Sequence, residues 1–303
     1  MSVRAHGAAG ARNAEARAGL LPDGAGKVIA SAMTKTLPDD ATILSLIEPL
    51  VLDAGRRIME IAAEGFSAEA KADASPVTRA DREAEAILLC GLRAHFPGVP
   101  VVAEEEASAG LAPRQAAGMF FLVDPLDGTR EFVAGGDDFT VNVALVRDGA
   151  PAVGAVYAPA CGQLYLGRPG FAEAVTADAG HRPRERAAIS VREPACPPVV
   201  VASRSHRTRE TEAFIARLGP VECVSIGSSL KFCLLAAGRA DLYPRLGRTM
   251  QWDTAAGDAV LRAAGGATRT LDGLPLAYGA GATPGDSPFA NPHFVAEGGR
   301  KRG

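Results

Sequence analysis

Residues 119–129 read Met-Phe-Phe-Leu-Val-Asp-Pro-Leu-Asp-Gly-Thr, and they are the most informative stretch of the chain. Their first half is an apolar run of strand length, which predicts a buried strand that ends at Val123. This end places Asp124 at the rim of a sheet, and the proline after it stiffens the next turn. Asp127 follows closely, so both carboxylates can face one pocket. Gly128 allows a close approach of the backbone to a ligand.

The two aspartates of this stretch predict a cation site. If a helix begins after Gly128, the amides of Gly128 and Thr129 form an anion site beside the acids. Acids and an anion site fit together when cations lie between them, and Mg²⁺ prefers carboxylates, waters and phosphate oxygens. A capped turn is the simpler alternative, because Asp and Gly favour turns. The EF-hand is excluded, since its alternating ligands and terminal Glu are absent.

Three other acidic clusters lie elsewhere in the chain: residues 71–81, which contain Asp73 and Asp81, residues 104–106 (Glu-Glu-Glu), and Trp252-Asp253. Taken singly, each has a simpler explanation than catalysis. Asp81 suits a surface acid or a helix cap, and Asp253 suits an N-cap. The glutamates follow a strand predicted at residues 99–103 and suit a solvated loop. It is the occurrence of all the clusters in one chain that favours a shared site.

Apolar periodicity predicts the helices of the first half. Apolar residues recur at helical spacing over residues 43–62 and 80–96. Asp39 or Asp40 is a suitable N-cap for the first of these helices. The dipeptide 148–149, Asp-Gly, predicts a hairpin between two strands of an antiparallel meander.

The pattern of elements changes in the second half. From residue 199 onward, short strands alternate with helices, whereas helices and a meander precede it. A Pro- and Arg-rich stretch over residues 170–198 separates the two patterns. We therefore expect two subdomains, an N-terminal α+β part over 39–180 with the metal site and a C-terminal α/β part over 181–303 that contributes Asp253.

Residues 1–38 differ from the rest of the chain. They are rich in Ala, Gly and Arg and show no apolar periodicity, which predicts a disordered tail. A targeting peptide is an alternative because acids are few, although no apolar h-region stands out. A mis-assigned start is another, because Met33 precedes the first helical pattern. Whether residues 1–32 are translated stays open.

Composition and charge exclude several classes of protein. The 303 residues carry 32 Lys and Arg against 35 Asp and Glu, a formal net charge of −3. This balance argues against binding of a nucleic acid polymer, which needs a clustered basic excess. No apolar run reaches the roughly 18 residues of a membrane span, so no transmembrane segment is expected. The 5 cysteines form no Cys-x-x-Cys pair, which favours reduced thiols in the cytoplasm.

The acidic clusters belong to longer motifs that occur in a fixed order. These are Glu104-Glu105, then residues 124–132 (Asp-Pro-Leu-Asp-Gly-Thr-Arg-Glu-Phe), then residues 252–266, which begin Trp-Asp-Thr-Ala-Ala and end Ala-Gly-Gly. The set resembles the magnesium-dependent, lithium-sensitive phosphatase superfamily that contains inositol monophosphatases and fructose-1,6-bisphosphatases. The resemblance extends from about residue 40 to about residue 297. It implies a layered αβαβα sugar-phosphatase fold, an architecture of mixed α+β and α/β class.

The resemblance also implies a metal site with two or three Mg²⁺ ions and inhibition by Li⁺. Glu104, Asp124 and the carbonyl of Leu126 would hold one ion. Asp124, Asp127 and Asp253 would hold the second. A third, weaker ion would share Glu104.

A catalytic pair is implied as well. Thr129, paired with Asp81, would orient and deprotonate the attacking water, because the carboxylate takes the hydroxyl proton while the hydroxyl oxygen accepts from the water. Which glutamate of residues 104–106 binds metal is a question of register. We choose Glu104 because it follows Val102-Ala103, and a small residue precedes the liganding Glu of the family.

Further motifs resemble the CysQ-type 3′(2′),5′-bisphosphate nucleotidase branch. They are Lys71-x-Asp73-x-Ser-Pro-Val-Thr-x-Ala-Asp81, Arg130-Glu131-Phe132, residues 138–145 (Asp-Phe-Thr-Val-Asn-Val-Ala-Leu), Ser203-Arg-Ser-His206, residues 227–233 (Gly-Ser-Ser-Leu-Lys-Phe-Cys) and residues 241–247 (Asp-Leu-Tyr-Pro-Arg-Leu-Gly). A bisphosphorylated nucleotide carries a second phosphate, which needs donors of its own. The implied substrate contacts are Gly128, Thr129, His206 (beside the adenine), Ser228, Lys231 and Arg245.

Simpler roles remain for these residues. Ser228 and Lys231 could simply begin a surface helix. Arg245 could have a structural role, and His206 could be an ordinary polar residue. Asp258 departs from the His or small residue expected in this branch. Because it lies roughly opposite Asp253 on the predicted helix, we expect it to be harmless, with an altered substrate pocket as the alternative.

The implied reaction removes the 3′-phosphate of adenosine 3′,5′-bisphosphate to give AMP and phosphate, a step in sulfur metabolism. Phosphoadenylylsulfate is a further implied substrate. The alternatives are an inositol monophosphatase or related sugar phosphatase, and a non-catalytic phosphate- or cation-binding module, against which the Thr129–Asp81 pair argues. We expect a small-molecule nucleotide as partner and a monomer or homodimer. The expected location is the cytoplasm, with the cytoplasmic face of the inner membrane as the alternative.

Overall fold

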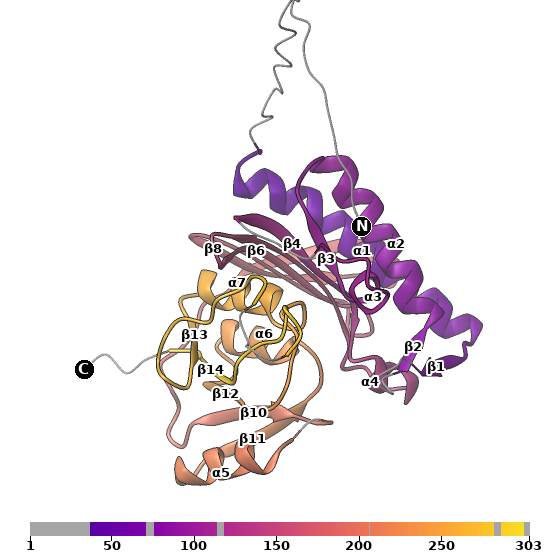
Figure 1. The fold of residues 1–303 in the computed structure, drawn as a ribbon. Coiled ribbons are helices and arrows are strands. Elements are labelled where there is room, and N and C mark those ends of the chain that lie inside the picture. Colours follow the sequence, from indigo (N-terminus) through magenta and orange to yellow (C-terminus); the bar gives the residue numbers. More distant parts are fainter. Residues whose placement is uncertain (1–36, 71–75, 114–117, 206, 282–285, 300–303) are drawn as a thin grey trace, which may run out of the picture. The chain divides into compact units, whose positions relative to one another are not determined.

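The computed structural model shown in Figure 1 describes residues 37–70, 76–113, 118–205, 207–281 and 286–299. The tail predicted over residues 1–38 lies almost wholly outside these residues. Lys71, Asp73 and His206 also lie outside them. No helix among the described residues is long and apolar enough to cross a membrane.

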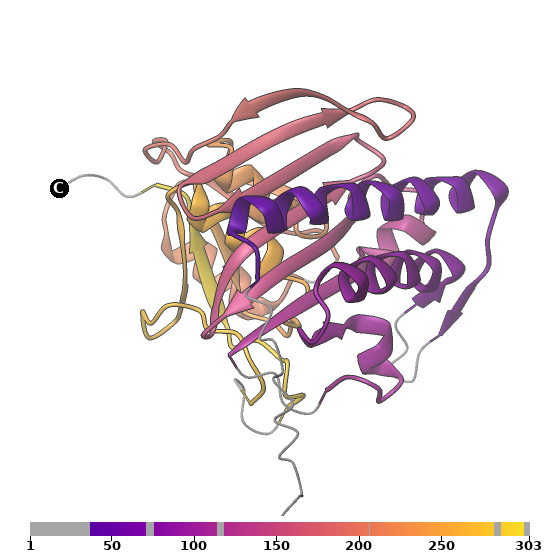
Figure 2. The same ribbon diagram turned by 90° about the horizontal axis from the view of Figure 1, so that it is seen from above.

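Helices and sheets alternate in layers (Figure 1). One face of a seven-stranded sheet is covered by α1 (Asp40–Glu64) and α2 (Arg79–His95), which Figure 2 shows side by side. Its other face packs against α6 (Leu230–Ala236) and α7 (Ala255–Ala263). Beyond them lie a five-stranded sheet and α5 (Arg209–Arg217). This order confirms the expected αβαβα layering.

The larger sheet has the strand order β3-β4-β5-β6-β7-β8-β9. Only β3 and β4 are parallel, and every other neighbouring pair is antiparallel. The sheet includes two strands, β8 and β9, in the stretch over 170–198 that we expected to be a junction. The strand bounds are β3 (Val101–Ala103), β4 (Met119–Asp127), β5 (Thr140–Arg147), β6 (Ala150–Ala158), β7 (Gln163–Arg168), β8 (Phe171–Ala177) and β9 (Pro183–Ala188).

The smaller sheet has the order β11-β10-β12-β14-β13. Its strands β11, β10 and β12 are parallel, while β14 is antiparallel to both of its neighbours. Its strand bounds are β10 (Val199–Ser203), β11 (Glu222–Ile226), β12 (Leu242–Arg245), β13 (Ala267–Thr270) and β14 (Phe294–Glu297). The remaining elements are the pair β1 (Ala68–Ala70) and β2 (Pro76–Thr78) and the short helices α3 (Glu104–Ser108) and α4 (Thr129–Val133).

The core explains why the large sheet is buried on both faces. Alternate side chains of a strand point to opposite faces. Along β4, Phe121 and Val123 pack in the apolar cluster with α1 and α2, whereas Phe120 and Leu122 pack in the cluster with α6 and α7. All four are almost completely buried. The continuous apolar run of β4 follows from this two-sided burial.

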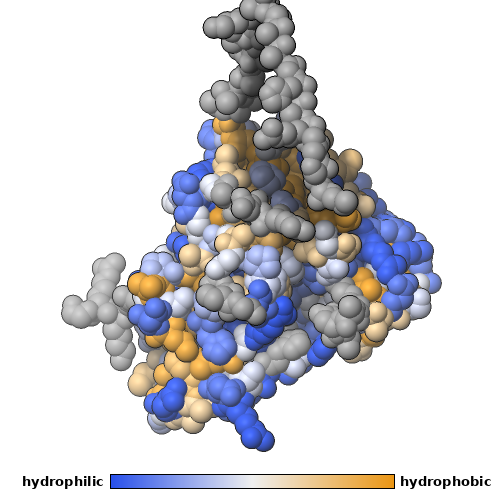
Figure 3. Space-filling model, in the orientation of Figure 1, coloured by the Kyte–Doolittle hydropathy of each residue, from blue (hydrophilic) through white to orange (hydrophobic). Residues whose placement is uncertain are grey.

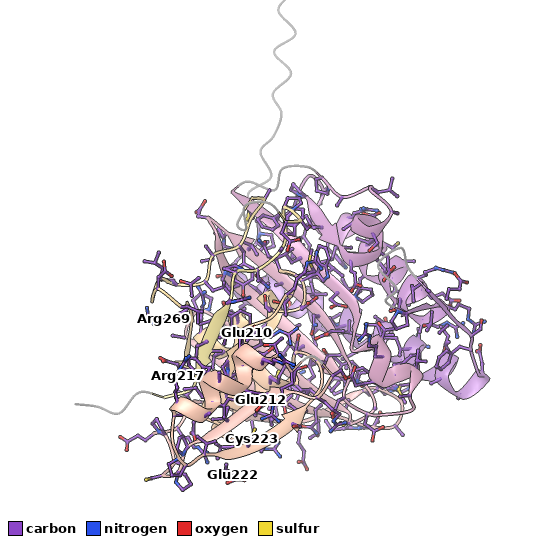
Figure 4. All side chains as sticks on the ribbon, turned by 60° about the horizontal axis from the view of Figure 1, so that its bottom comes forward. Glu210, Glu212, Arg217, Glu222, Cys223 and Arg269 are labelled. Carbon is purple, nitrogen blue, oxygen red and sulfur yellow. The ribbon has the colours of Figure 1, made fainter. Side chains whose placement is uncertain are left out.

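Charged residues gather on the outer layers. Figure 3 shows hydrophilic residues at the end of the molecule where β1 and β2 lie, and Arg82 pairs there with Glu69. Figure 4 shows Glu210, Glu212 and Arg217 on α5, outside the smaller sheet. These side chains are exposed, so their charges are solvated.

Asp258 is a buried structural acid. It is 0% exposed, and its carboxylate accepts from Arg262 Nε at 3.0 Å and from the Tyr278 hydroxyl at 3.0 Å. Arg262 also donates to the carbonyl of Leu276 at 2.7 Å, which ties α7 to the segment before residue 278. Asp258 is absent from the lining of the pocket described below. Its carboxylate thus serves packing between α7 and its neighbours.

Asp258→Ala should therefore lower the free energy of unfolding by about 3 kcal/mol, because it leaves Arg262 without its buried anion. Urea denaturation measures this loss. The control is Glu69→Ala, which breaks an exposed pair with Arg82 (52% and 63% exposed) and should change stability by less than about 1 kcal/mol. Equal losses of unfolding free energy in both variants would show that the buried Asp258 network stabilises the chain no more than an exposed ion pair does.

Candidate active site

A pocket of about 670 Å³ brings together most of the predicted site residues. Its walls come from both sheets and from the helices between them. Its lining includes Glu104, Asp124, Leu126, Asp127, Gly128, Thr129, Ser228, Lys231, Arg245 and Asp253. Asp81 does not line the pocket, because it lies behind Thr129.

Strand β4 delivers the two aspartates of the 119–129 stretch. It continues past its predicted end at Val123 to Asp127, and its register with β5 shifts between Asp124 and Asp127. Such an irregularity re-aims side chains at a sheet end. Gly128 then takes a left-handed φ of 97° as the N-cap residue directly before α4. A Cβ on Gly128 would lie 2.8 Å from the carbonyl oxygen of Asp138, so this turn requires glycine.

The acidic residues of the pocket lie close enough to repel one another, and Asp124, which is 1% exposed, is buried while the others are half-buried. Burial raises the pKa of Asp124 well above its ordinary value, and the charges of Glu104, Asp127 and Asp253 add to the rise. Burial likewise raises the pKa of Asp253, again with help from Asp127 and Glu104. Burial also raises the pKa of Asp127, although the Lys231 ammonium opposes it. Negative charges that gather in this way around a buried aspartate require a compensating cation.

The donor set suits Mg²⁺ in chemistry. Carboxylate oxygens and the Leu126 carbonyl are hard oxygen donors of the kind that Mg²⁺ prefers. As the side chains stand, no three His, Cys, Asp or Glu of the described residues converge tightly enough to enclose a metal ion. The fit therefore rests on the density of negative charge and on donor type, because long-range repulsion between the carboxylates depends little on small side-chain rotations.

Thr129 and Asp81 form a hydrogen-bonded pair. The Thr129 hydroxyl lies 3.0 Å from Asp81 Oδ1 and 3.0 Å from the carbonyl oxygen of Leu126, and both are acceptors for its single proton. Asp81 Oδ2 accepts from the Thr78 amide at 2.7 Å and the Thr78 hydroxyl at 2.8 Å, which caps α2. One carboxylate thus acts as a helix cap and also faces Thr129.

Glu104 reaches the pocket from the start of α3. The amides of Glu105 and Glu106 donate to the carboxylate of Glu85 on α2 at 2.8 and 2.9 Å, which anchors this short helix. Glu106 pairs with Arg93 at 2.7 Å. Of these three glutamates, Glu104 lines the pocket.

The pocket lining contains the basic residues Arg130, Lys231, Arg245 and Arg248, of which Lys231 and Arg245 are buried. Lys231 donates to the carbonyl of Ser228 and lies 3.5 Å from that of Ile226, while Arg245 donates to the carbonyl of Arg248 at 2.9 Å. Burial lowers the pKa of Lys231 to about 8, and Asp127 opposes the shift. Ser228 and Lys231 are buried, so the surface-helix alternative for them is wrong.

Two residues around the pocket escaped the sequence analysis. Glu85 lies four residues after Asp81 and therefore on the same face of α2. This spacing could have identified Glu85 from the sequence. Ser229 directly follows Ser228, and its hydroxyl contacts Asp127 at 2.9 Å. Nothing in the sequence distinguishes these adjacent serines.

Glu85 predicts a specific dependence of stability on pH. Burial raises its pKa from 4.5 to about 7, against the pull of the amides of Glu105 and Glu106. Between pH 4.5 and pH 7 the folded chain therefore binds more protons at this site than the unfolded chain. The protonated form of Glu85 thus favours the folded chain. Its contribution to the free energy of unfolding is fully present below pH 4.5 and is lost as the pH rises through 7.

Glu85→Gln removes this titration. Its stability relative to the unsubstituted chain should increase from pH 4.5 to pH 7. Urea denaturation without Mg²⁺, at several pH values, measures the difference. Parallel pH profiles for the two proteins would contradict the expected titration of Glu85.

Comparison with known proteins places this site in a family. The sequence pattern of the inositol monophosphatase family matches residues 39–294. The 3′(2′),5′-bisphosphate nucleotidase CysQ of Escherichia coli (strain K12) is 44% identical over 254 residues, 83% of this chain and 98% of that protein. The protein of the same name from Salmonella typhimurium is 43% identical over the same shares of both chains.

Solved structures agree with the sequence comparison. The crystal structure of CysQ from Bacteroides thetaiotaomicron, a bacterial member of the inositol monophosphatase family, superposes with a TM-score of 0.70 at 34% identity, over 85% of this chain and 97% of that chain. An inositol monophosphatase from Anabaena gives a TM-score of 0.64 at 26% identity, over 86% and 91%. The chain belongs to the inositol monophosphatase family.

Proposed function

We propose that this chain is a Mg²⁺-dependent 3′(2′),5′-bisphosphate nucleotidase that removes the 3′-phosphate of adenosine 3′,5′-bisphosphate. The observation that carries this proposal is the composition of one pocket, which is lined both by a group of carboxylates and by the buried cations Lys231 and Arg245. The carboxylates suit a cation that binds the phosphate to be cleaved. Lys231 and Arg245 suit a second phosphate, which an inositol monophosphate lacks. The names of the two relatives described above support the same activity.

The proposed metal ligands are those of the acidic side of the pocket. Glu104, Asp124 and the Leu126 carbonyl would hold one Mg²⁺, and Asp124, Asp127 and Asp253 a second, with Glu104 shared by a weaker third. Mg²⁺ in such a site lowers the pKa of water and stabilises the charge that develops on the leaving oxygen. The place of Glu104 in the lining, with Glu106 paired to Arg93, supports the choice of Glu104 as ligand.

Thr129 and Asp81 are the proposed general-base pair. Asp81 Oδ1 accepts the Thr129 proton at 3.0 Å, which frees the hydroxyl oxygen to accept from a water. The cap bonds from Thr78 hold Asp81 in place for this task. Charge stabilisation and positioning then carry most of the rate enhancement, since the uncatalysed hydrolysis of phosphate monoesters is among the slowest reactions known.

Gly128 and Thr129 would contact the phosphate to be cleaved. Ser228, Lys231 and Arg245 would contact the second phosphate, and His206 would lie beside the adenine. The proposal includes inhibition by Li⁺, turnover of phosphoadenylylsulfate and a role in recycling for sulfur metabolism. It also includes a cytoplasmic location, a monomeric or homodimeric state and the division into subdomains 39–180 and 181–303.

Product identification tests the proposed reaction. Incubation of adenosine 3′,5′-bisphosphate with the chain and Mg²⁺ should give adenosine 5′-phosphate and phosphate, and the rate should fall when Li⁺ is added. Adenosine 3′-phosphate as the product would place the wrong phosphate at the carboxylates. Adenosine as the only product would show that the pocket does not distinguish the phosphates at all.

Arg245→Ala tests recognition of the second phosphate. Loss of a charged hydrogen bond of about 1.5–3 kcal/mol should raise KM for adenosine 3′,5′-bisphosphate by about 10- to 100-fold. The same variant should retain its KM for a phosphate monoester that carries a single phosphate. Steady-state kinetics with both substrates measures the contrast. Equal increases of KM for both would assign Arg245 a structural role.

A further inference from the structure

The Ser229 side chain lies where it can either cap its own helix or contact residues of the pocket. Ser229 is the N-cap residue of α6, and it is 2% exposed. Serine at an N-cap commonly accepts a hydrogen bond from the first turn of its own helix. The Ser229 side chain makes no such bond. Its hydroxyl instead contacts residues of other elements.

The Ser229 hydroxyl joins three segments of the chain. It lies 2.9 Å from Asp127 Oδ2 and 2.6 Å from the carbonyl oxygen of Asp253, and it accepts from Asn142 Nδ2 at 3.0 Å. The Asn142 donor directs the single hydroxyl proton toward the two acceptors. Ser229 therefore supplies a hydroxyl donor that can reach both the Asp127 carboxylate and the Asp253 backbone.

These contacts connect the two proposed ligands of one cation. Asp127 comes from β4 of the larger sheet, and Asp253 comes from the turn before α7. The carboxylate of Asp253 has its own donor, the Met250 amide at 2.9 Å. Asp127 and Asp253 repel each other as neighbouring anions, so directed donors are needed to fix their mutual orientation.

We propose that Ser229 is a positioning residue that holds Asp127 against the backbone of Asp253, so that the carboxylates of both meet the same Mg²⁺. This inference rests on the proposed function for the presence of Mg²⁺, but not on the identity of the substrate. Partners that orient metal ligands contribute strongly to metal binding, because a free carboxylate must lose rotational freedom when it binds.

The neighbouring serine provides a matched control. The Ser228 hydroxyl lies 3.5 Å from the Leu230 amide, and the Ser228 carbonyl accepts from Lys231. Ser228 lines the pocket as Ser229 does. The adjacent serines therefore differ in one respect that matters here, the hydroxyl contact of Ser229 with Asp127.

Direct titration of Mg²⁺ into the full chain without substrate tests the proposal. Ser229→Ala should weaken Mg²⁺ binding by about 10- to 100-fold and should reduce the rise of Tm that Mg²⁺ causes. Ser228→Ala should retain the Mg²⁺ affinity of the unsubstituted chain. Ser229→Thr, which keeps the hydroxyl, should recover affinity. Should Ser229→Ala fail to fold, Ser229→Cys keeps the volume with a weak donor and should weaken Mg²⁺ binding in the same direction.

A double variant separates positioning from general damage. Asp127→Asn should itself weaken Mg²⁺ binding. Ser229→Ala should then cause little further loss of affinity, because the Asp127 carboxylate that Ser229 holds is already absent. Unchanged Mg²⁺ affinity in folded Ser229→Ala would overturn the proposal, as would equal losses in Ser228→Ala or fully additive losses with Asp127→Asn. A chain that prefers another phosphomonoester would overturn the proposed function and leave this result intact.

Discussion

Asp124→Asn is expected to lower kcat/KM by about 10³-fold, because it removes the carboxylate charge assigned to both of the main Mg²⁺ ions. Asp124 is 1% exposed and is the ligand assigned to both of the main Mg²⁺ ions. An amide retains the size of the side chain and can still accept from the Leu126 amide, which donates to Asp124 at 3.0 Å. The substitution thus removes a charge while it preserves the shape of the site.

Stability should change in the opposite direction from activity. Without Mg²⁺ at pH 8, Asp124→Asn should raise the free energy of unfolding, because it relieves repulsion from Glu104, Asp127 and Asp253. The unsubstituted chain should gain about 2.7 kcal/mol from Mg²⁺ at 100 times its Kd, and the variant should gain much less at the same concentration. Urea denaturation with and without Mg²⁺ measures both quantities.

The control for Asp124 is Asp53→Asn on α1, where the carboxylate is 59% exposed. It should change neither kcat/KM nor the stabilisation by Mg²⁺. If Asp124→Asn kept its stabilisation by Mg²⁺, the ions would bind elsewhere. If it became less stable without Mg²⁺, the buried charge would be compensated within the protein.

Thr129→Ala is expected to lower kcat by about 10²- to 10⁴-fold at saturating Mg²⁺ and substrate, which is the range for loss of general-base catalysis. The hydroxyl is the group that contacts Asp81 at 3.0 Å. Mg²⁺ affinity should stay unchanged, because the Leu126 carbonyl and the carboxylates remain. This combination separates Thr129 from the metal ligands, whose loss affects both quantities.

Two variants complete the test of this pair. Thr129→Ser keeps the hydroxyl and should retain kcat within about tenfold. Thr129→Ala combined with Asp81→Asn should be about as slow as the slower single variant, because residues that act as a unit are not additive. Additive losses, or a Thr129→Ala enzyme with nearly full kcat, would remove Thr129 from the proton-transfer step.

The sequence was most informative where chemistry is concentrated in a short segment. Residues 119–129 combine a strand, a turn and two acids, and these features are local. The first helices were predictable because their apolar residues recur with the helical period. The convergence of Asp81, Glu104 and Asp253 depended on the resemblance to a family, because these residues are far apart in sequence and no periodicity relates them.

Local pattern failed where tertiary contacts decide the structure. All residues of β9 are exposed, so the sequence shows no apolar alternation that would predict a strand. The strand forms because its backbone pairs with β8, which is a tertiary contact. The extension of β4 to Asp127 depends on its irregular pairing with β5. Ser229 could not be distinguished from Ser228, since the difference between them arises only when β4, β5 and α7 meet around α6.

The most direct measurement is phosphate release with Mg²⁺ from adenosine 3′,5′-bisphosphate and from inositol 1-phosphate under identical conditions. The account predicts that kcat/KM for the nucleotide is higher by about 100-fold or more, since inositol 1-phosphate leaves the buried Lys231 and Arg245 without their phosphate partner. Equal rates, or a preference for inositol 1-phosphate, would contradict it and indicate an inositol monophosphatase. Release from neither substrate by folded protein that binds Mg²⁺ would contradict catalysis itself and indicate a binding module.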